Sequence, residues 1–578
     1  MRDGVKLHTV VFTPNDTSEP YPILMWRTPY SVGPYYPDSG YYSHARYSWN
    51  HFVKEGYIIV YQDVRGRFMS EGDYVNMRPY LKDKKESSDV DETTDTYDTI
   101  DWLIKNIPNN NGKVGMWGIS YPGFYAAQGA IDAHPALKAV SPQAPIANWF
   151  ARDDWHHNGA LAIGGSFGFL LQFGPVREGL VKTWPPAFNF PTKSGYDFFL
   201  KLGPLKNVNE LYYHDKIPFW KDIMEHDTYD DFWKTKNNLT NLKNIKPAML
   251  EVGGWFDAEN LYGALNTYQA VEANSPDCNN SIVMGPWYHG GWVRCAGDSL
   301  GDIYFGQQTR DYYVQNIELP FFNHYLKDDP WTAIPEASIF ITGSNEWKSF
   351  ETWPPKGLNE VDFYLEEENK LGTDKNGTSN VSYVEYVSDP ADPVPFTKQV
   401  TTGIPRSYMT EDQTFAAERG DVVYFSTEPL EEDLTIIGKI TADLYVSTSG
   451  TDCDFVVKVI DVIPAEEMNN PDLDHDYEML LRGDIFRAKF RNSFENPEAM
   501  IPGEVTNLKF DMDEVAHTFQ KGHRIMVQIQ SSWFPLFDRN PQKFMKISDA
   551  DESDFVKATQ RIYFSEDAHS KIAFNKYN

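Results

Sequence analysis

The chain has 578 residues, of which 41% are hydrophobic and 15% aromatic, a composition that suits about two to four well-packed domains rather than a disordered chain. Its formal net charge of −31 repels phosphate backbones and anionic lipids, which argues against nucleic-acid or membrane partners, and no apolar run approaches the length of a membrane span. The three cysteines, Cys278, Cys295 and Cys453, exclude a disulfide framework. A Cys278–Cys295 disulfide and two free thiols both remain open.

Residues 1–147 alternate between strand patterns and helix patterns. Strands are expected at 5–12, 22–27, 57–63 and 113–117, and a helix at 93–106. This order predicts a largely parallel sheet covered by helices. The opening residues Met1–Gly4 carry no signal-peptide pattern and lead straight into a strand, so we expect an N-terminal segment to be missing from this chain.

From residue 148 the alternation stops, and 148–241 has the Trp, Phe, Lys and Asp content of helices and loops. An insertion of this kind between sheet elements commonly covers an active site, so we expect a helical cap. Strand patterns return in 242–335, which is assigned to the same α/β domain. From 336 to 578 short strands follow one another without long helices, which predicts an all-β sandwich with jelly-roll topology.

The most informative motif is Gly118-Ile-Ser-Tyr-Pro-Gly123, where a short apolar strand ends and an Ala-rich helix begins. A strand–turn–helix of this kind exposes a serine, here Ser120, as a nucleophile. The usual Gly-x-Ser-x-Gly pattern would place a glycine at 122, but this chain has Pro122 and delays the glycine to Gly123. The motif therefore needs catalytic partners elsewhere in the sequence to support it.

Two residues follow in the order that an α/β-hydrolase requires, an acid and then a histidine, each just after a strand. Asp257 follows Glu251-Val-Gly-Gly-Trp-Phe, and His289 follows Val283-Met-Gly-Pro-Trp-Tyr. Alone, each residue has an ordinary explanation as a solvated carboxylate or a structural histidine, but together with Ser120 they predict a catalytic triad. The backbone N–H of Tyr121 and the hydroxyl of Tyr30 are the expected donors to the oxyanion.

The motifs around the nucleophile, together with Gln62-Asp-Val-Arg-Gly-Arg67 and Gly285-Pro-Trp-Tyr-His-Gly290, resemble the X-Pro dipeptidyl-peptidase/cocaine esterase family of serine hydrolases. That family tolerates the delayed glycine. The resemblance covers essentially the whole chain apart from an N-terminal arm. It implies an α/β-hydrolase domain with a helical cap insertion, a C-terminal jelly-roll domain, no cofactor and no metal. It also implies a periplasmic or secreted location, with a cytoplasmic one left open, and leaves a homo-oligomer open.

Within that family the chain is most similar to the α-amino acid ester hydrolases, some described as glutaryl-7-aminocephalosporanic acid acylase-like. Their acidic cluster receives the α-ammonium group of the substrate, and Asp154 and Glu259 match two of its three carboxylates. The third position is Asn260, a departure that removes one charge but keeps an oxygen that can accept from an ammonium. The resemblance thus implies an aminoacyl-enzyme formed from a small amino acid ester or amide and released by water or an amine.

Several alternatives remain beside this hypothesis. The enzyme could be an esterase or acylase with no need for a free amine, or an X-prolyl dipeptidyl peptidase; a carbohydrate-binding protein with an inactive hydrolase domain is the alternative from another class. A metal site at Asp153, Asp154, His156 and His157 is disfavoured, because neighbouring residues on one segment rarely point to a common centre. The Asp472-x-Asp-x-Asp stretch lacks the glycine and distal glutamate of a calcium loop.

Overall fold

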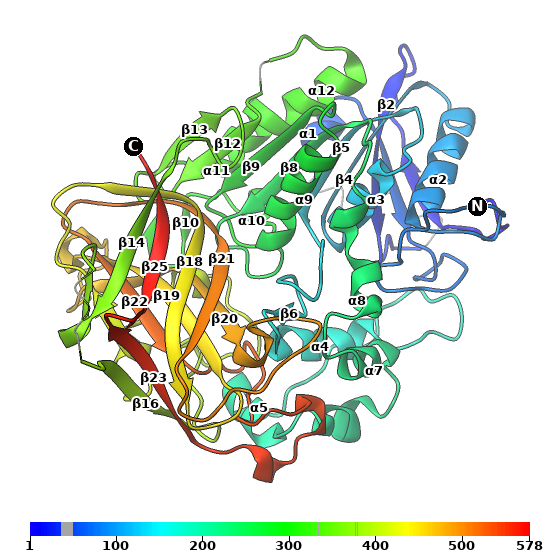
Figure 1. Cartoon of the computed structure of the whole chain (residues 1–578). Coiled ribbons are helices and arrows are strands. Elements are labelled where there is room, and N and C mark those ends of the chain that lie inside the picture. The colour runs from blue at the N-terminus through cyan, green and yellow to red at the C-terminus, as the bar shows by residue number, and fades with distance from the viewer. Residues whose placement is uncertain (36–49, 333, 376, 378–379) are drawn as a thin grey trace.

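The computed structural model describes residues 1–35, 50–332, 334–375, 377 and 380–578. Within them, a nine-stranded mixed sheet forms the centre of the N-terminal part (Figure 1). The inner strands are parallel, whereas β1 and β13 at the two edges pair antiparallel with their neighbours. In sheet order the strands are β1 (Thr9–Phe12), β3 (Ile58–Asp63), β2 (Tyr21–Thr28), β4 (Asn110–Ser120), β5 (Leu137–Pro145), β8 (Ala248–Gly254), β9 (Asn280–Gly285), β12 (Ala337–Ile341) and β13 (Glu346–Phe350).

Helices cover both faces of this sheet, because successive strand residues point to opposite sides and both sides are apolar. On β2, Ile23 packs into the core beneath α2 and α3, whereas the next residue, Leu24, packs into the core beneath α1 and α12. The helix α2 begins with a capping box at Asp91. The helices are α1 (Asn50–Lys54), α2 (Glu92–Asn106), α3 (Tyr121–Ala130), α9 (Leu261–Asn274), α10 (Gly291–Arg294), α11 (Thr309–Tyr313) and α12 (Leu319–Lys327).

Between β5 and β8 the chain leaves the sheet and forms the predicted run of short helices. It begins with a small hairpin and contains an aromatic core in which Phe167 contacts Phe188, Phe198 and Tyr213. The elements are β6 (His156–His157), β7 (Ala160–Leu161), α4 (Ile163–Phe173), α5 (Gly195–Leu202), α6 (Lys206–Val208), a π-helix (Asn209–Tyr213), α7 (Pro218–Glu225), α8 (Asp231–Lys236) and a 3₁₀-helix (Asn238–Asn241). We refer to residues 148–241 as the insertion.

The C-terminal part is rich in strands, which confirms the predicted change from an α/β-hydrolase domain to a β domain (Figure 1). In its described residues, twelve strands form one hydrogen-bonded network around a common apolar core. The jelly-roll topology and the exact domain boundaries stay predictions. The strands are β14 (Asn359–Glu366), β15 (Lys370–Gly372), β16 (Tyr383–Ser388), β17 (Val423–Ser426), β18 (Leu434–Thr448), β19 (Asp454–Ile463), β20 (Tyr477–Arg487), β21 (Thr506–Phe519), β22 (Arg524–Gln530), β23 (Ala558–Ser565), β24 (Ala568–His569) and β25 (Lys571–Tyr577).

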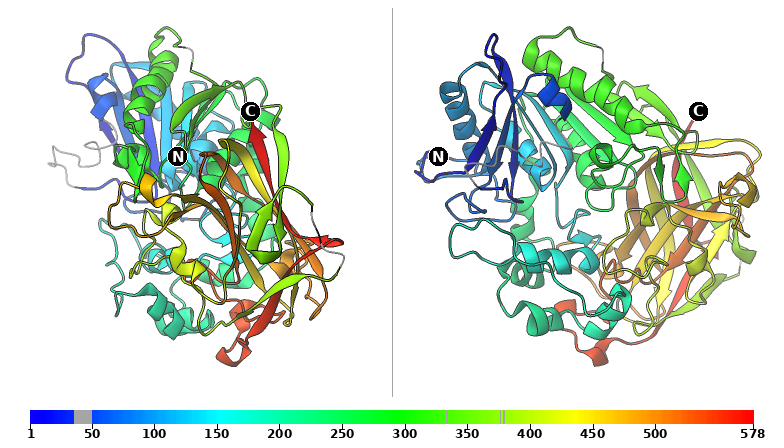
Figure 2. Two further views of the ribbon diagram at one scale, coloured as in Figure 1. Left: turned by 90° about the vertical axis from the view of Figure 1, so that its left-hand side faces the viewer. Right: turned by 180° about the vertical axis from the view of Figure 1, so that it is seen from behind.

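The two domains and the insertion pack closely, as the views from the side and from behind agree (Figure 2). A single apolar cluster joins Trp255 and Ile339 of the α/β domain to Leu480 and Trp533 of the β domain. The Arg482 guanidinium on β20 donates to the Trp255 carbonyl oxygen at 2.8 Å, which ties the β domain to the loop after β8. This contact matters for the site, because that loop carries Asp257.

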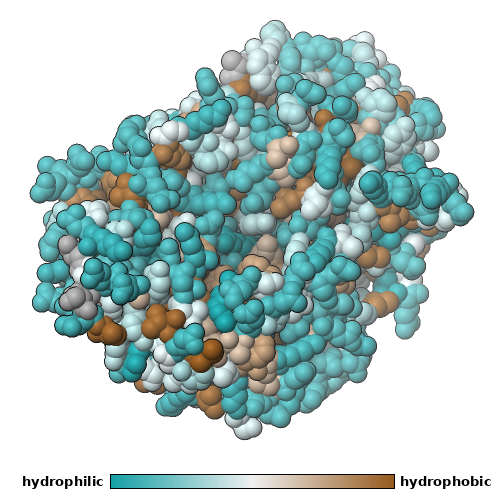
Figure 3. Space-filling view, viewed as in Figure 1, coloured by the Kyte–Doolittle hydropathy of each residue, from teal (hydrophilic) through white to brown (hydrophobic). Residues whose placement is uncertain are grey.

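The surface visible in Figure 3 is mostly hydrophilic, in keeping with the strongly negative net charge. In the described part of the chain, no helix is long and apolar enough to cross a membrane. Cys278, Cys295 and Cys453 are all free thiols, so of the two alternatives left open by the sequence, the structure has the unpaired one.

Candidate active site

Ser120 lies at the junction of β4 and α3 with a left-handed backbone, φ 68° and ψ −127°. A residue other than glycine in this region is strained, and such strain is common where a nucleophile is held in a sharp turn. The turn needs close backbone approaches, since a Cβ on Gly118 would lie 2.3 Å from the Pro122 carbonyl oxygen. One on Gly123 would lie 2.8 Å from the Gln143 carbonyl oxygen. The delayed glycine is therefore required where α3 packs on β5, and Pro122 fits the first turn of the helix.

Asp257 and His289 meet at the carboxyl ends of β8 and β9, which are neighbours in the sheet. The Asp257 carboxylate lies 2.8 and 3.0 Å from His289 Nδ1 and accepts backbone N–H bonds from Glu259 and Asn260 at 2.8 and 2.9 Å. Although burial opposes ionisation of both groups, their attraction lowers the pKa of Asp257 and raises the pKa of His289 to about 9, with Glu259 contributing to the latter. Asp257 thereby orients the imidazole through Nδ1 and leaves Nε2 on the side away from this carboxylate.

Ser120 lies in the wall of the same cavity as Asp257 and Glu259. Its Oγ is 3.5 Å from Asn260 Oδ1, and His289 Nε2 is 3.5 Å from Glu259 Oε2. Among the described residues no hydrogen bond joins Ser120 directly to His289. Catalytic hydrogen bonds often tighten only in the complex with substrate, so this spacing is compatible with Ser120 as nucleophile and His289 as base.

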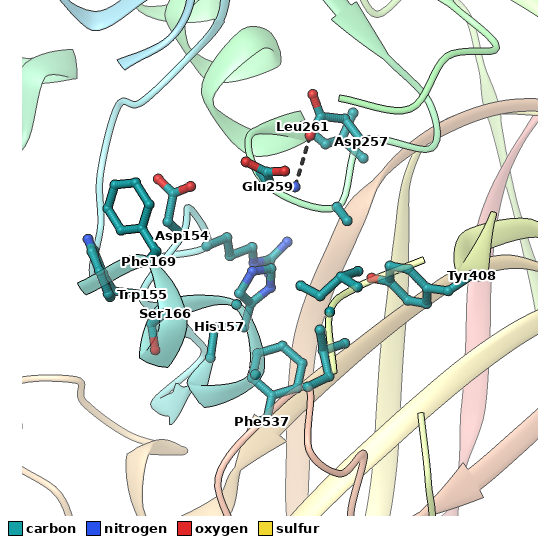
Figure 4. Close-up of a pocket in the computed structure, with 18 of the residues that line it drawn as sticks. Asp154, Trp155, His157, Ser166, Phe169, Asp257, Glu259, Leu261, Tyr408 and Phe537 are labelled. Carbon is teal, nitrogen blue, oxygen red and sulfur yellow. Dashed lines mark hydrogen bonds between the residues drawn. The ribbon is translucent and has the colours of Figure 1, made fainter. Parts of the chain in front are cut away.

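The residues expected to bind an ammonium group lie together beside Ser120. The Asn260 Nδ2 amide donates to Asp153 Oδ1 at 3.3 Å and to Asp154 Oδ2 at 3.2 Å, and the Trp149 indole also donates to Asp154 at 2.8 Å. Figure 4 shows the Asp154 and Glu259 carboxylates facing the cavity from the insertion and from the loop after β8. Desolvation raises the pKa of both carboxyls, although the Glu259 side chain is 49% exposed, and a bound cation would favour their ionised forms.

The two expected oxyanion donors differ in how their side chains are used. The Tyr121 hydroxyl accepts from the Met77 backbone N–H at 2.6 Å and donates to Asn76 Oδ1 at 3.4 Å. The donor that Tyr121 can offer a ligand is therefore its backbone N–H, in the first turn of α3. The Tyr30 ring lies edge-on to Tyr121 and lines the cavity. Burial raises the pKa of Tyr30 well above its usual value, which keeps its hydroxyl protonated and able to donate.

The cavity itself measures about 480 Å³ and is lined by all three parts of the molecule (Figure 4). The insertion contributes apolar rings such as Trp155 and Phe169, and the β domain contributes Tyr408, Trp533 and Phe537. The insertion and the β domain thus enclose the carboxyl ends of the parallel strands in a pocket large enough for a small ligand.

The sequence did not predict the roles of two residues near the site, Asp153 and Arg67. Asp153, considered only as a metal ligand, accepts the Ala147 and Asn148 backbone N–H groups at 2.8 and 2.7 Å and so fixes the start of the insertion. Arg67 donates to the Pro29 carbonyl oxygen at 3.1 Å and so holds the loop of Tyr30. The Gln62–Arg67 motif contained that arginine, but only the fold brings it to this loop.

The histidines beside Asp153 do not join it in a metal centre. Burial lowers the pKa of His156 to about 3, which keeps it neutral, and His157 Nδ1 lies 3.5 Å from Asp484 of the β domain. Within the described residues, no group of three or more His, Cys, Asp or Glu side chains has the arrangement of a metal site.

A strained serine, a carboxylate-bound histidine and an adjoining cavity at the carboxyl ends of parallel strands define a serine hydrolase of the α/β-hydrolase class. The chain belongs to the X-Pro dipeptidyl-peptidase (S15) family. The model of that family matches residues 3–291, and the model of the X-Pro dipeptidyl-peptidase C-terminal non-catalytic domain matches residues 330–573.

Full-length relatives agree with this assignment. The chain is 28% identical to a cocaine esterase of Rhodococcus sp. (strain MB1 Bresler), over 97% of this chain and 95% of that protein. It is similar in structure to an aminopeptidase from the marine sediment archaeon Thaumarchaeota archaeon, with 37% identity, a TM-score of 0.92 and coverage of 100% and 95% of the two chains. The corresponding values for an α-amino acid ester hydrolase are 36%, 0.91, 100% and 95%.

Proposed function

We propose that this enzyme cleaves esters and amides of α-amino acids whose amino group is free. The observation that carries the proposal is the position of the ammonium site relative to the nucleophile. Asp154 and Glu259 line the same cavity as Ser120, and the Asn260 amide oxygen is 3.5 Å from Ser120 Oγ. In an α-amino acid ester the amino nitrogen is two bonds from the carbonyl carbon, so a carbonyl at Ser120 brings the ammonium to where these three oxygens can receive it.

In this mechanism His289 Nε2 takes the proton of Ser120 while Oγ attacks the substrate carbonyl. The oxyanion accepts from the Tyr121 backbone N–H and the Tyr30 hydroxyl. As the tetrahedral intermediate collapses, His289 returns the proton to the departing alcohol or amine, which leaves an aminoacyl ester on Ser120. Water, deprotonated by His289, then releases the amino acid; an amine in its place would form a new amide or dipeptide.

Two of the similar proteins support this substrate class, since an aminopeptidase and an α-amino acid ester hydrolase both act on compounds of α-amino acids. The aminopeptidase favours a second candidate activity at the same site, removal of the N-terminal residue of a short peptide. A glutaryl amide acylase, a general esterase and an X-prolyl dipeptidyl peptidase stay as alternatives. We further propose that the insertion acts as a cap over the cavity and that the enzyme is periplasmic or secreted.

The test compares L-phenylalanine methyl ester with its N-acetyl derivative. We expect the parent to prefer the free amine by about 100-fold in kcat/KM, because the acetylated nitrogen carries no charge for Asp154 and Glu259 to pair with. Asp154→Asn should lose most of that preference, whereas Glu210→Gln, at an exposed acid of the insertion, should keep it. Equal rates on the two esters in the parent would rule out the proposed specificity.

A further inference from the structure

His289 contacts carboxylates at both of its ring nitrogens. Asp257 holds Nδ1 at 2.8 Å, and Glu259 Oε2 lies 3.5 Å from Nε2. Nε2 is the atom that must accept the proton of Ser120. The Ser120 hydroxyl donates to the Asn260 amide oxygen instead, so the base contacts Glu259 and the nucleophile contacts Asn260.

The charges around the imidazole make it a poor base in this arrangement. Burial disfavours the imidazolium, and Arg294, whose side chain donates to the His289 carbonyl oxygen, opposes it too. The attraction of Asp257 and Glu259 outweighs these effects and raises the pKa of His289 to about 9. The Asp154 carboxylate also interacts electrostatically with this imidazolium. At neutral pH an imidazolium with this pKa is mostly protonated and cannot take a proton from Ser120.

The two carboxylates differ in how firmly they are held. Asp257 is fully buried and accepts two backbone N–H bonds. The Glu259 side chain is 49% exposed, and in the described part of the chain its only ion pair is with His289. Glu259 also faces the cavity beside Asp154 (Figure 4). A cation that enters there can draw Glu259 away, whereas its two backbone N–H bonds hold Asp257 in place.

We propose that Glu259 restrains His289 in the empty enzyme and that the α-ammonium of the substrate releases it. The ammonium pairs with Glu259, and its positive charge offsets the negative charge that stabilises the imidazolium. The Nε2 proton then leaves to the solvent of the cavity, and the neutral nitrogen turns to Ser120. This inference rests on the proposed function, and it makes Glu259 a positioning residue for the base as well as a binding residue.

The experiment uses Glu259→Gln with two esters, L-phenylalanine methyl ester and methyl 3-phenylpropanoate, which lacks the amine. We expect the variant to be slower than the parent on the amino ester but at least threefold faster in kcat/KM at pH 7 on the ester without the amine. The acidic limb of its pH profile on that second ester should move to lower pH, because a change of one pKa unit alters the fraction of neutral imidazole about tenfold.

Asp154→Asn is the matched control, because Asp154 belongs to the same ammonium site but contacts Trp149 and Asn260 rather than His289. It should slow the amino ester, whereas Glu210→Gln, at an exposed acid of the insertion outside the cavity, should leave the rates on both esters unchanged. Glu259→Ala should behave like Glu259→Gln on both esters, and its melting temperature shows whether the fold is intact, so an effect peculiar to the glutamine side chain can be recognised. If neither Glu259 variant speeds the ester without the amine, or if the acidic limb stays in place, the restraint does not exist. That outcome is distinct from failure of the proposed function, which is read from the N-acetyl comparison in the parent.

Discussion

Replacing Asn260 by aspartate would turn the amide that links Asp153 and Asp154 into a third carboxyl. Asn260 is fully buried, and its Nδ2 donates to the two carboxylates at 3.3 and 3.2 Å. Asn260→Asp removes that donor and, when ionised, puts a negative charge at the same distances. The two side chains have nearly the same volume, so the change tests charge and hydrogen bonding rather than packing.

The magnitude follows from these distances. Two unit charges 3.2 Å apart repel by about 5 kcal/mol at an effective dielectric constant of ~20. Burial, and then the proximity of Asp154, already raise the pKa of Asp153 well above its usual value, so the pKa of the new carboxyl should be raised too. An acid whose pKa is higher in the folded than in the unfolded state loses stability as the pH rises above the unfolded value of about 3.9. We expect Asn260→Asp to cost about 3 kcal/mol at pH 8 and much less at pH 5.

Urea unfolding of parent and variant at both pH values measures this difference, with Asn316→Asp as a control at an exposed asparagine. The control should shift little, and equally at the two pH values. At pH 8 the added charge should also lower KM for L-phenylalanine methyl ester. If the stability gap between parent and Asn260→Asp is the same at pH 5 and pH 8, the Asn260 amide does not bridge the two carboxylates and the account of the ammonium site is wrong.

Four further substitutions, at three positions, test other parts of the site. Ser120→Ala and Ser120→Gly should both lose at least 10³-fold in kcat. In urea unfolding the glycine variant should be more stable than the alanine variant by about 1 kcal/mol, because glycine adopts the positive φ of residue 120 without strain. Equal stabilities of the two variants would argue against backbone strain at this position. Tyr30→Phe should lower kcat about 10²-fold with little change in KM, and an unchanged kcat would remove Tyr30 from the oxyanion site. Gly263→Ala should lower the melting temperature by several degrees, since its Cβ would lie 1.7 Å from the Pro145 carbonyl oxygen, and a parent-like melting curve would contradict that packing.

The order of elements and the family could be predicted from the sequence, because both depend on local patterns. Apolar runs of strand length placed β2, β3 and β4 to within three residues of their observed ends, and the helix expected at 93–106 is α2 (Glu92–Asn106). The turn at Ser120 could be predicted for the same reason, since its glycines and proline act within a few residues. The delayed glycine looked irregular only because its reason, the carbonyl oxygen of Gln143 on β5, lies on another strand.

What the residues touch was decided by the tertiary structure alone. The sequence marked Glu259 and Asn260 as ammonium ligands, but the pairing of Glu259 with His289 and of Asn260 with Asp153, Asp154 and Ser120 depends on how β8, β9 and the insertion come together. The sequence likewise did not predict that Tyr408, Trp533 and Phe537 of the β domain line the cavity. Local backbone preferences and apolar periodicity are encoded over a few residues, whereas distances across a site are set by the packing of segments that are distant in the sequence.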